Sequence, residues 1–290
     1  MHGTTIAMTA FASPDKATPR PGLRVQGVRS MRLPWRFDVA AALHEAQQLP
    51  PAWWRSHFNQ GRHDGGWQAL ALRSTPQAAL DIQPVEADAS VYEDCDALRA
   101  CPAIQAILRS LDLSFQSVRL MQLLPGSEIM EHTDAGLCAA NGEARLHIAL
   151  QTDEQVFFHI AGQRLPMHVG ECWYTDVSLP HRVRNRSGQT RMHLVMDVQV
   201  NERLATAFQQ GDMGEASAHD DDPWAAFQRF RAAVFNAPAL ADELAACPDL
   251  SSLSARSVEL GRQLGLEFDA SDVESAMKAG RQAWVQQWML

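Results

Sequence analysis

Apolar and polar residues alternate in short runs through the middle of the chain, over residues 118–200. Turn sequences such as Pro125-Gly126, Asn141-Gly142 and Ser187-Gly188 separate these runs. Alternation with a period of two residues buries one face of a strand, and several short strands at this spacing are typical of a sandwich or a small barrel. The pattern therefore predicts a domain that is mainly β, with some helix, in the centre of the chain.

The segment before this region predicts a mixture of helix and strand. Residues 38–49 have a helical pattern that ends at Pro50-Pro51, because proline cannot continue the hydrogen-bond ladder of a helix. Residues 67–72 favour a strand after the turn sequence Asp64-Gly65-Gly66. Residues 95–110 favour a second helix.

The two ends of the chain differ from its centre. Residues 1–24 are rich in Pro, Thr, Ala and Gly without periodicity, which predicts a flexible tail before a β domain over residues 25–204. Residues 205–222 are polar and acidic, as expected of a linker. Residues 223–290 carry no strand signal and predict a small domain of three short helices, the last starting at a capping box formed by Ser271 and Glu274.

Composition narrows the class of protein. The 290 residues carry 25 basic and 34 acidic side chains, a formal charge of −9, which argues against nucleic acid or an anionic membrane as a partner. No apolar run reaches the roughly 18 residues of a membrane span, and no secretion signal is evident at the start. The five cysteines lack CxxC spacing, which disfavours a thiolate zinc site. We expect a soluble, cytoplasmic protein.

One short sequence, His132-Thr133-Asp134, points to a metal. Residues i and i+2 of a strand share a face, so His132 and Asp134 point the same way. His181, which follows a Ser-Leu-Pro sequence, is the best candidate for a third ligand. Two histidines and one carboxylate with open positions form the facial triad of non-haem Fe(II) oxygenases. The alternative is that these histidines merely decorate the surface.

Two predicted strands carry an arginine and a histidine on one face and apolar residues on the other. Arg145 and His147 share a face in the first, and Arg191 and His193 share a face in the second. Such a face either meets water or lines a polar cavity. A cavity would suit a dianionic 2-oxo acid, because guanidinium binds a carboxylate in a bidentate manner. Arg191 could reach that carboxylate from a strand beside the metal.

These motifs, in this order, resemble the aspartyl/asparaginyl β-hydroxylase family of Fe(II)- and 2-oxoglutarate-dependent oxygenases. The resemblance covers roughly residues 55–200. It is strongest to the bacterial proline cis-4-hydroxylase branch of the family, which has a similar Ser-Leu-Pro-His sequence at the distal ligand and a similar last strand. The matching elements are Gly66-Trp67, Pro125-Gly126, His132-x-Asp134, Arg145-x-His147, Gly170-Glu171, Asp176-x-Ser178, His181 and Arg191.

The resemblance implies a double-stranded β-helix, a jelly roll of the cupin type, followed by the small helical domain. It implies Fe(II) held by His132, Asp134 and His181, with 2-oxoglutarate and O2 as co-substrates. Arg191 would bind the distal carboxylate of 2-oxoglutarate. Arg145 and His147 would contact the co-substrate or the substrate near the metal. Asp176 and Ser178 would orient His181 or the loop that holds it.

Three further residues have two interpretations each. His193 either supports a group that binds the cofactor or fills the barrel interior. Trp67 is either a core aromatic or a wall of the substrate site. Arg73 either clamps a carboxylate of the substrate or forms a salt bridge at the surface.

The C-terminal part resembles the helical leader-peptide-like domain of nitrogen-fixation gene clusters. The resemblance lies in the order Phe230, Pro238-x-Leu240, Leu244, then either Glu259-Leu260-Gly261 or Leu264-Gly265, then Phe268-Asp269-Ala270-x-Asp272. Such domains serve as leaders of ribosomally made peptides. This likeness implies either a peptide-modifying context or recognition of a leader by helices.

The sequence thus predicts a hydroxylase of an aliphatic C–H bond in an amino acid, free or within a peptide, that releases succinate and CO2. Its partner would be that small molecule or peptide, and its oligomeric state stays open. Two other functions also stay open: a cupin-like metal enzyme that does not use 2-oxoglutarate, and a binding module with a degenerate barrel. Arg191 argues against the first, and the intact ligand set argues against the second.

Overall fold

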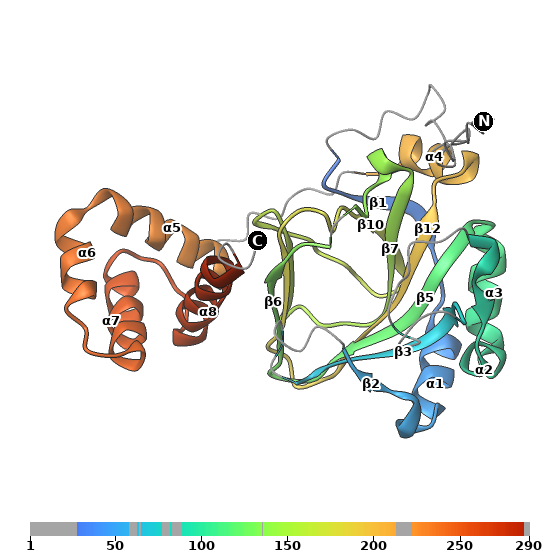
Figure 1. The fold of residues 1–290 in the computed structure, drawn as a ribbon, viewed down its shortest axis with the longest axis horizontal. Helices are drawn as coiled ribbons and strands as arrows, with labels where there is room; N and C mark the ends of the chain where they lie inside the picture. Colours follow the sequence, from blue (N-terminus) through green and yellow to red (C-terminus); the bar gives the residue numbers. More distant parts are fainter. Residues whose placement is uncertain are drawn as a thin grey trace, which may run out of the picture.

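Two antiparallel sheets of unequal size face each other and enclose the centre of the molecule (Figure 1). In the computed structural model, residues 28–57, 63, 65–76, 82, 89–134, 136–212 and 222–286 are described, with side chains to residue 278. The predicted tail and residues 213–221 of the predicted linker lie outside the described residues.

Within this described part, eight strands form the larger sheet in the order β1-β10-β7-β12-β5-β3-β2, with β4 paired to β3. Four strands form the smaller sheet in the order β6-β11-β8-β9. The larger sheet consists of β1 (Ser30–Arg36), β2 (Arg55–Ser56), β3 (Trp67–Ser74), β4 (Glu93–Asp94), β5 (Ser114–Leu123), β7 (Glu143–Gln151), β10 (Glu171–Thr175) and β12 (Arg191–Gln199). The smaller sheet consists of β6 (Glu128–His132), β8 (Val156–Ile160), β9 (Gln163–Arg164) and β11 (His181–Asn185).

From β5 onward the chain crosses repeatedly from one sheet to the other: β5, β7, β10 and β12 lie in the larger sheet, and β6, β8, β9 and β11 in the smaller one. This path is that of a jelly roll, so the predicted double-stranded β-helix is confirmed. Neighbouring strands in each sheet come from distant parts of the chain, and β12 lies between β5 and β7.

Side chains that alternate between the two faces of the larger sheet form two separate apolar cores. Leu120, Leu146 and Leu194 point outward and pack against the N-terminal helices. Met121 and Val195, one residue further along β5 and β12, point between the sheets. This division follows from the period of two residues in a strand. It leaves the interior positions of β7 and β12 free to carry the arginines and histidines.

Helices cover the outer face of the larger sheet (Figure 1). In α3, apolar residues at helical spacing are buried, and full burial of each such side chain contributes about 1.5–3 kcal/mol. These helices are α1 (Ala40–Gln48), α2 (Asp96–Arg99), α3 (Pro102–Leu111) and α4 (Glu202–Gln210), and short 3-10 turns occupy Pro51–Trp53, Ala89–Val91 and Ala139–Asn141.

Helix α4 lies where the sequence predicted the start of a linker. The amide oxygen of Asn201 accepts a hydrogen bond from the Leu204 backbone N–H at 2.9 Å and caps the helix. Leu204 and Phe208 are buried against the larger sheet. The boundary predicted at residue 205 was therefore wrong, because this segment has an apolar face that joins the core of the barrel.

Four helices, rather than the predicted three, form a separate C-terminal module in the described chain, at the left of Figure 1. The predicted capping box was also wrong: the Asp269 carboxylate accepts hydrogen bonds from the backbone N–H groups of Ser271 and Asp272 at the start of the last helix. The module has its own apolar core. The helices are α5 (Pro223–Asn236), α6 (Pro238–Ala245), α7 (Leu250–Gln263) and α8 (Ala270–Gln286).

Among the described helices, none combines the length and the apolar character that crossing a membrane requires.

Candidate active site

The three predicted metal ligands meet at one end of the β6–β11 pair. His132 and His181 are directly opposite each other in this ladder, and Asp134 follows β6. Their potential ligand atoms all lie within 4.8 Å of one another, and His132 Nε2 is 3.8 Å from Asp134 Oδ1. The two imidazole centroids are 4.2 Å apart. Strands far apart in sequence thus assemble the donor set that the spacing predicted.

Both imidazoles are held in the orientation that a metal ligand needs. The Nδ1–H of His132 donates to the Met130 carbonyl at 2.8 Å, and the Nδ1–H of His181 donates to the Leu179 carbonyl at 3.0 Å. With the proton on Nδ1, the lone pair of Nε2 is free to bind a metal. Burial, the largest influence, lowers the pKa of His181 to about 4, so its ring is neutral at pH 7.

The Asp134 carboxylate is oriented from two directions. The backbone N–H of Asp134 donates to the Val177 carbonyl at 2.8 Å, which ties this residue to the loop before His181. Its Oδ2 accepts a hydrogen bond from Arg145 Nη1 at 2.5 Å. Burial alone would raise the pKa of this carboxyl, but the charges of Arg145 and the two histidines outweigh it and bring the pKa to about 2. Asp134 is therefore ionised and can offer Oδ1 to a cation.

Arg145 belongs to a buried ion network that sequence reasoning missed. It donates from Nε to Asp197 Oδ1 at 2.7 Å and from Nη2 to Asp197 Oδ2 at 3.1 Å. Arg119 on β5 also donates to Asp197 Oδ2. The order of the strands β5, β12 and β7 brings these three residues together. The network fixes the guanidinium that holds Asp134, so Arg145 contacts one of the predicted metal ligands. Its predicted contact with the co-substrate or substrate stays a prediction.

Arg191 is a buried cation with no anionic partner. It is 3% exposed, and no carboxylate in the described part of the chain forms an ion pair with it. Its Nη2 lies 3.0 Å from His193 Nδ1, and its Nε has no hydrogen-bond partner among the described residues. Burial lowers the pKa of Arg191 to about 9, which still leaves it protonated at pH 7. An unpaired buried charge is costly, so this position is suited to an anion from outside.

His147 and His193 extend the polar region around Arg191. Both ring nitrogens of His147 and Nε2 of His193 are buried without a hydrogen-bond partner among the described residues. The two rings lie 5.7 Å apart, edge to face. Burial, together with the charge of Arg191, holds both pKa values well below the usual range. Since His193 also contacts Arg191, the two histidines and this arginine form one buried polar group.

A family model described as aspartyl/asparaginyl β-hydroxylase matches residues 36–200. The chain belongs to this family. The matched segment begins at the end of β1 and finishes just after β12, so it contains all the site residues described above. It does not include the C-terminal module. No curated protein matches the chain at a significant level.

Solved structures with related folds are distant. A 2OG-Fe(II) oxygenase-family oxidoreductase from Burkholderia pseudomallei is 16% identical, with a TM-score of 0.40, and the match covers 60% of this chain and 86% of that chain. Protein TT1209 from Thermus thermophilus is 23% identical, with a TM-score of 0.24, over 30% of this chain and 79% of that one. A cupin-superfamily sugar phosphate isomerase from Silicibacter pomeroyi is 17% identical, with a TM-score of 0.26, over 47% and 60%.

The residues present fit the cofactors of this family. Two imidazole Nε2 atoms and one carboxylate oxygen are the donors that Fe(II) takes in hydroxylases. The unpaired guanidinium of Arg191 and the unmet nitrogens of His147 and His193 fit an organic dianion such as 2-oxoglutarate.

Asp176 and Ser178 lie in the turn that leads to His181. Asp176 Oδ1 accepts hydrogen bonds from the backbone N–H of Ser178 at 3.1 Å and from its hydroxyl at 2.5 Å. Asp176 is in turn tied to the N-terminal segment, since its backbone N–H donates to the Arg29 carbonyl at 2.9 Å. Both residues therefore lie in the turn before His181, and their role in orienting it stays a prediction.

An aromatic wall lies beside His132. Trp67 is buried, its ring centroid is 5.9 Å from that of His132, and its Nε1 has no partner among the described residues. His57 stacks on Trp67 with centroids 3.3 Å apart, and His63 meets it edge-on at 5.7 Å. Sequence reasoning singled out Trp67 but missed both histidines, because neither has a recognisable spacing to the other site residues. The substrate role of Trp67 stays a prediction.

Arg73 has partners of its own. Its Nη1 donates to Asp94 Oδ1 at 2.6 Å across the β3–β4 pair, and its Nε donates to the Phe115 carbonyl at 3.4 Å. This ion pair corresponds to the second of the two interpretations that the sequence left open, and it occupies the guanidinium that a substrate carboxylate would need.

Proposed function

We propose that this member of the family hydroxylates an aliphatic C–H bond of an amino acid, free or within a peptide, and releases succinate and CO2. The observation that carries the proposal is Arg191, a buried and protonated guanidinium without a carboxylate partner in the described chain, in the same barrel as the His132, Asp134 and His181 cluster. A dianionic co-substrate that binds both the cation and the metal satisfies the two together.

The residues divide the work between them. Fe(II), when bound, supplies with 2-oxoglutarate and O2 the oxidising chemistry that no side chain can perform. His132, Asp134 and His181 would hold the metal on one face and leave the other open. Arg191 would bind the distal carboxylate of 2-oxoglutarate, and His147 and His193 would donate to it or to its neighbouring carboxylate. The apolar core between the sheets, with residues such as Phe158 and Val195, excludes water.

The substrate would approach along the wall of Trp67 and His57. Burial, followed by the charges of Arg119 and Arg145, holds the pKa of His57 well below its usual value, so this wall beside His132 carries a neutral ring. A buried and unpartnered Trp67 Nε1 can donate to a carbonyl or carboxylate oxygen of the substrate. These features suit a small molecule with both apolar and polar parts, such as an amino acid or a residue in a peptide.

The resemblance to the proline cis-4-hydroxylase branch favours a free amino acid. A peptide substrate is favoured by a different observation, the C-terminal module with its own core, which resembles a leader-peptide-like domain. A screen of amino acids and of leader-bearing peptides, with Fe(II), 2-oxoglutarate and O2, would separate the two. We expect a product heavier by one oxygen atom and an equal amount of succinate.

The same screen tests the proposal as a whole. Succinate release that needs Fe(II) supports 2-oxoglutarate chemistry. A cupin-like metal enzyme would convert its substrate with metal but without succinate. A binding module with a degenerate barrel would fail to retain Fe(II) in equilibrium dialysis. Either of the last two results would contradict the proposal.

A further inference from the structure

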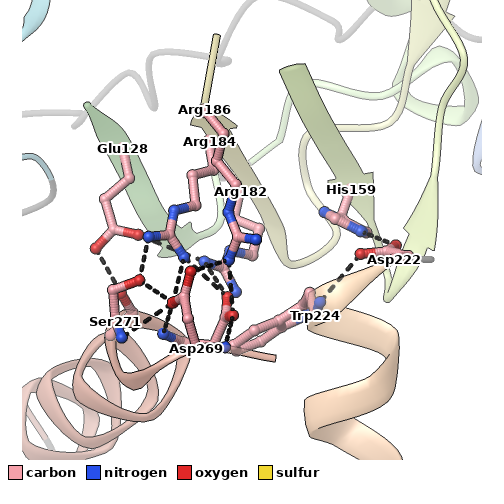
Figure 2. A network of polar contacts seen from close by, with 11 residues as sticks. Glu128, His159, Arg182, Arg184, Arg186, Asp222, Trp224, Asp269 and Ser271 are labelled. Carbon is pink, nitrogen blue, oxygen red and sulfur yellow. Dashed lines mark hydrogen bonds and ion pairs between the residues drawn. The ribbon is translucent and has the colours of Figure 1, made fainter. Parts of the chain in front are cut away.

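Alternate residues from Arg182 to Arg186, on the outer face of β11 and just after its end, are arginines, and the first of them follows the predicted metal ligand His181. His181 and Val183 point between the sheets, whereas Arg182, Arg184 and Arg186 point the opposite way, toward the C-terminal module (Figure 2). Arg182 is the residue after His181, and its side chain is only 3% exposed. Two cations on one short strand and a third just after it repel one another and need anions that face them.

The start of α8 supplies those anions. Arg184 Nη1 lies 3.0 Å from Asp272 Oδ1, and Arg186 Nη2 lies 2.9 Å from Asp272 Oδ2. Asp269 forms ion pairs with the same two arginines, with Oδ1 3.4 Å from Arg184 Nη1 and Oδ2 2.6 Å from Arg186 Nη2. The side chain of Asp272 is 2% exposed, so the contact is shielded from water and weakly screened by salt.

The same helix also contacts β6, the strand that ends at His132. Ser275 donates from its hydroxyl to Glu128 Oε1 at 2.5 Å, and Glu128 Oε2 lies 3.4 Å from Arg182. Glu128 therefore links β6 to both β11 and α8 (Figure 2). We call the four residues Asp269, Ser271, Asp272 and Ser275 the α8 clamp.

The other end of the module makes a second contact with the same sheet. The guanidinium of Arg182 stacks on Trp224 at 3.6 Å from the ring centroid. Asp222, which caps α5 through the Trp224 backbone N–H, lies 2.5 Å from His159 Nε2 on β8. The module thus contacts β6, β11 and β8 on their outer side, and the predicted metal ligands His132, Asp134 and His181 lie on the inner side.

We propose that the α8 clamp is a positioning element for the metal site: it sets the two histidine strands at the separation that a metal needs. This inference rests on the proposed metal centre. His132 and His181 are opposed in the β6–β11 ladder, and the clamp grips Glu128 on the first strand and the arginines on the second. A metal between the two imidazoles and the clamp behind them stabilise one and the same arrangement of the strands.

Two contacts that stabilise one arrangement are thermodynamically coupled, and the coupling is reciprocal. Loosening the clamp weakens metal binding by some factor, and metal binding tightens the clamp by the same factor. Such couplings are typically about 5- to 150-fold. A module that was merely attached to the barrel would show neither effect.

The test compares three single substitutions in the full chain. Asp272→Asn keeps the volume but removes the charge that the arginines share. Ser275→Ala removes one hydroxyl and so tests the clamp with little risk to folding. Glu259→Gln is the matched control, because Glu259 pairs with Arg256 within the module at 2.5 Å and has no described contact with the barrel.

Two readouts are measured on each protein: the affinity for Co2+ alone, by titration calorimetry, and the hydrogen exchange of the amides in β6, β11 and α8. We expect Asp272→Asn to weaken Co2+ binding about fivefold or more and to speed exchange in both histidine strands. Ser275→Ala should do the same to a smaller extent, and Glu259→Gln should match the wild type. Co2+ should slow exchange at the start of α8 in the wild type.

The inference is overturned if Asp272→Asn or Ser275→Ala speeds exchange in α8 while Co2+ affinity and exchange in β6 and β11 stay unchanged. Should Asp272→Asn not fold, Ser275→Ala decides by the same criterion. A wild-type protein that binds no Co2+ overturns the proposed metal site itself. If the wild type binds Co2+ and the clamp variants bind it with the same affinity, only the coupling is overturned.

Discussion

Two buried arginines in the barrel interior differ in whether the protein gives them carboxylate partners. Arg145 on β7 binds two carboxylates of the protein, Asp134 and Asp197. Arg191 on β12 binds none in the described chain, although it is just as deeply buried. The effect on their pKa values is opposite: the two carboxylates raise that of Arg145 despite burial, whereas burial alone lowers that of Arg191 to about 9.

The difference separates a part of the site that the protein completes from a part that it leaves for a ligand. The region around Arg145 is satisfied internally and holds Asp134 in place. The region around Arg191, with His147 and His193, contains buried nitrogens without partners, which a folded protein avoids unless something else binds there. The predictions below test this distinction.

The largest effect is expected at the metal ligands. Asp134→Ala or His132→Ala should lower 2-oxoglutarate turnover by more than about a hundredfold, beyond the 10- to 100-fold typical of residues that only orient ligands. The measurement is succinate formed per enzyme, with Fe(II) binding followed in parallel. Turnover that persists at the wild-type rate in either variant would show that the cluster is not the metal site.

Removing the unpaired arginine should act on the co-substrate alone. Arg191→Ala should raise the KM for 2-oxoglutarate on the order of a hundredfold, because a buried charge-assisted contact contributes about 2–5 kcal/mol. Metal affinity should change little. Arg191→Lys should recover part of the loss, since a lysine keeps the charge but not the planar fork. An unchanged KM in Arg191→Ala would contradict the role assigned to it.

Breaking the satisfied region should act on the metal instead. In Asp197→Asn, Arg145 loses its anchoring charge and Asp134 loses its fixed orientation. We expect metal affinity to fall about 10- to 100-fold, with a smaller change in the KM for 2-oxoglutarate. If Asp197→Asn and Arg191→Ala gave the same pattern of effects, the division between the two regions would be wrong.

Acid should destabilise the metal-free protein in a defined window. Burial lowers the pKa of His181 to about 4, so between that value and the ordinary value of about 6.5 the unfolded chain binds a proton that the folded chain does not. Stability should therefore fall as the pH drops through this window, by about 1 kcal/mol per pH unit for such a group. Urea midpoints across the window measure it, and His181→Gln should give a shallower fall.

The smallest effect is expected at Arg73. Its ion pair with Asp94 lies partly in solvent, so Arg73→Gln should cost less than about 1 kcal/mol in stability and change turnover less than twofold. Thermal melts and succinate assays suffice as measurements. A large rise in the KM for the organic substrate would instead restore Arg73 to the substrate site.

Much of the site follows from the sequence because its spacing is local. The spacing in His132-Thr133-Asp134 predicts two neighbouring ligands, although β6 ends at His132 and Asp134 lies just beyond the strand instead of on its face. The alternation around Arg145 and Arg191 predicts strands, which the structure has as β7 and β12. The partners were harder to find. Asp197 and Arg119 meet Arg145 only because β12 lies between β5 and β7, and no local pattern encodes that order.

The errors at the ends of elements have a similar cause. Asn201 and the apolar spacing of Leu204 and Phe208 were signals for a helix, but the acidic residues further on made the whole segment resemble a linker. The capping box at Ser271 was expected from spacing alone. The structure uses Asp269 as the cap and turns the Ser271 hydroxyl toward Arg184, a contact that only the docked module creates.

The measurement that tests the central claim most directly is the binding of labelled 2-oxoglutarate under anaerobic conditions, by equilibrium dialysis, to wild type and to Arg191→Ala, with and without Fe(II). The account predicts one equivalent bound by the wild type only when metal is present, and at least about a tenfold weaker affinity in Arg191→Ala. Equal binding by both proteins, or binding that ignores the metal, would contradict it.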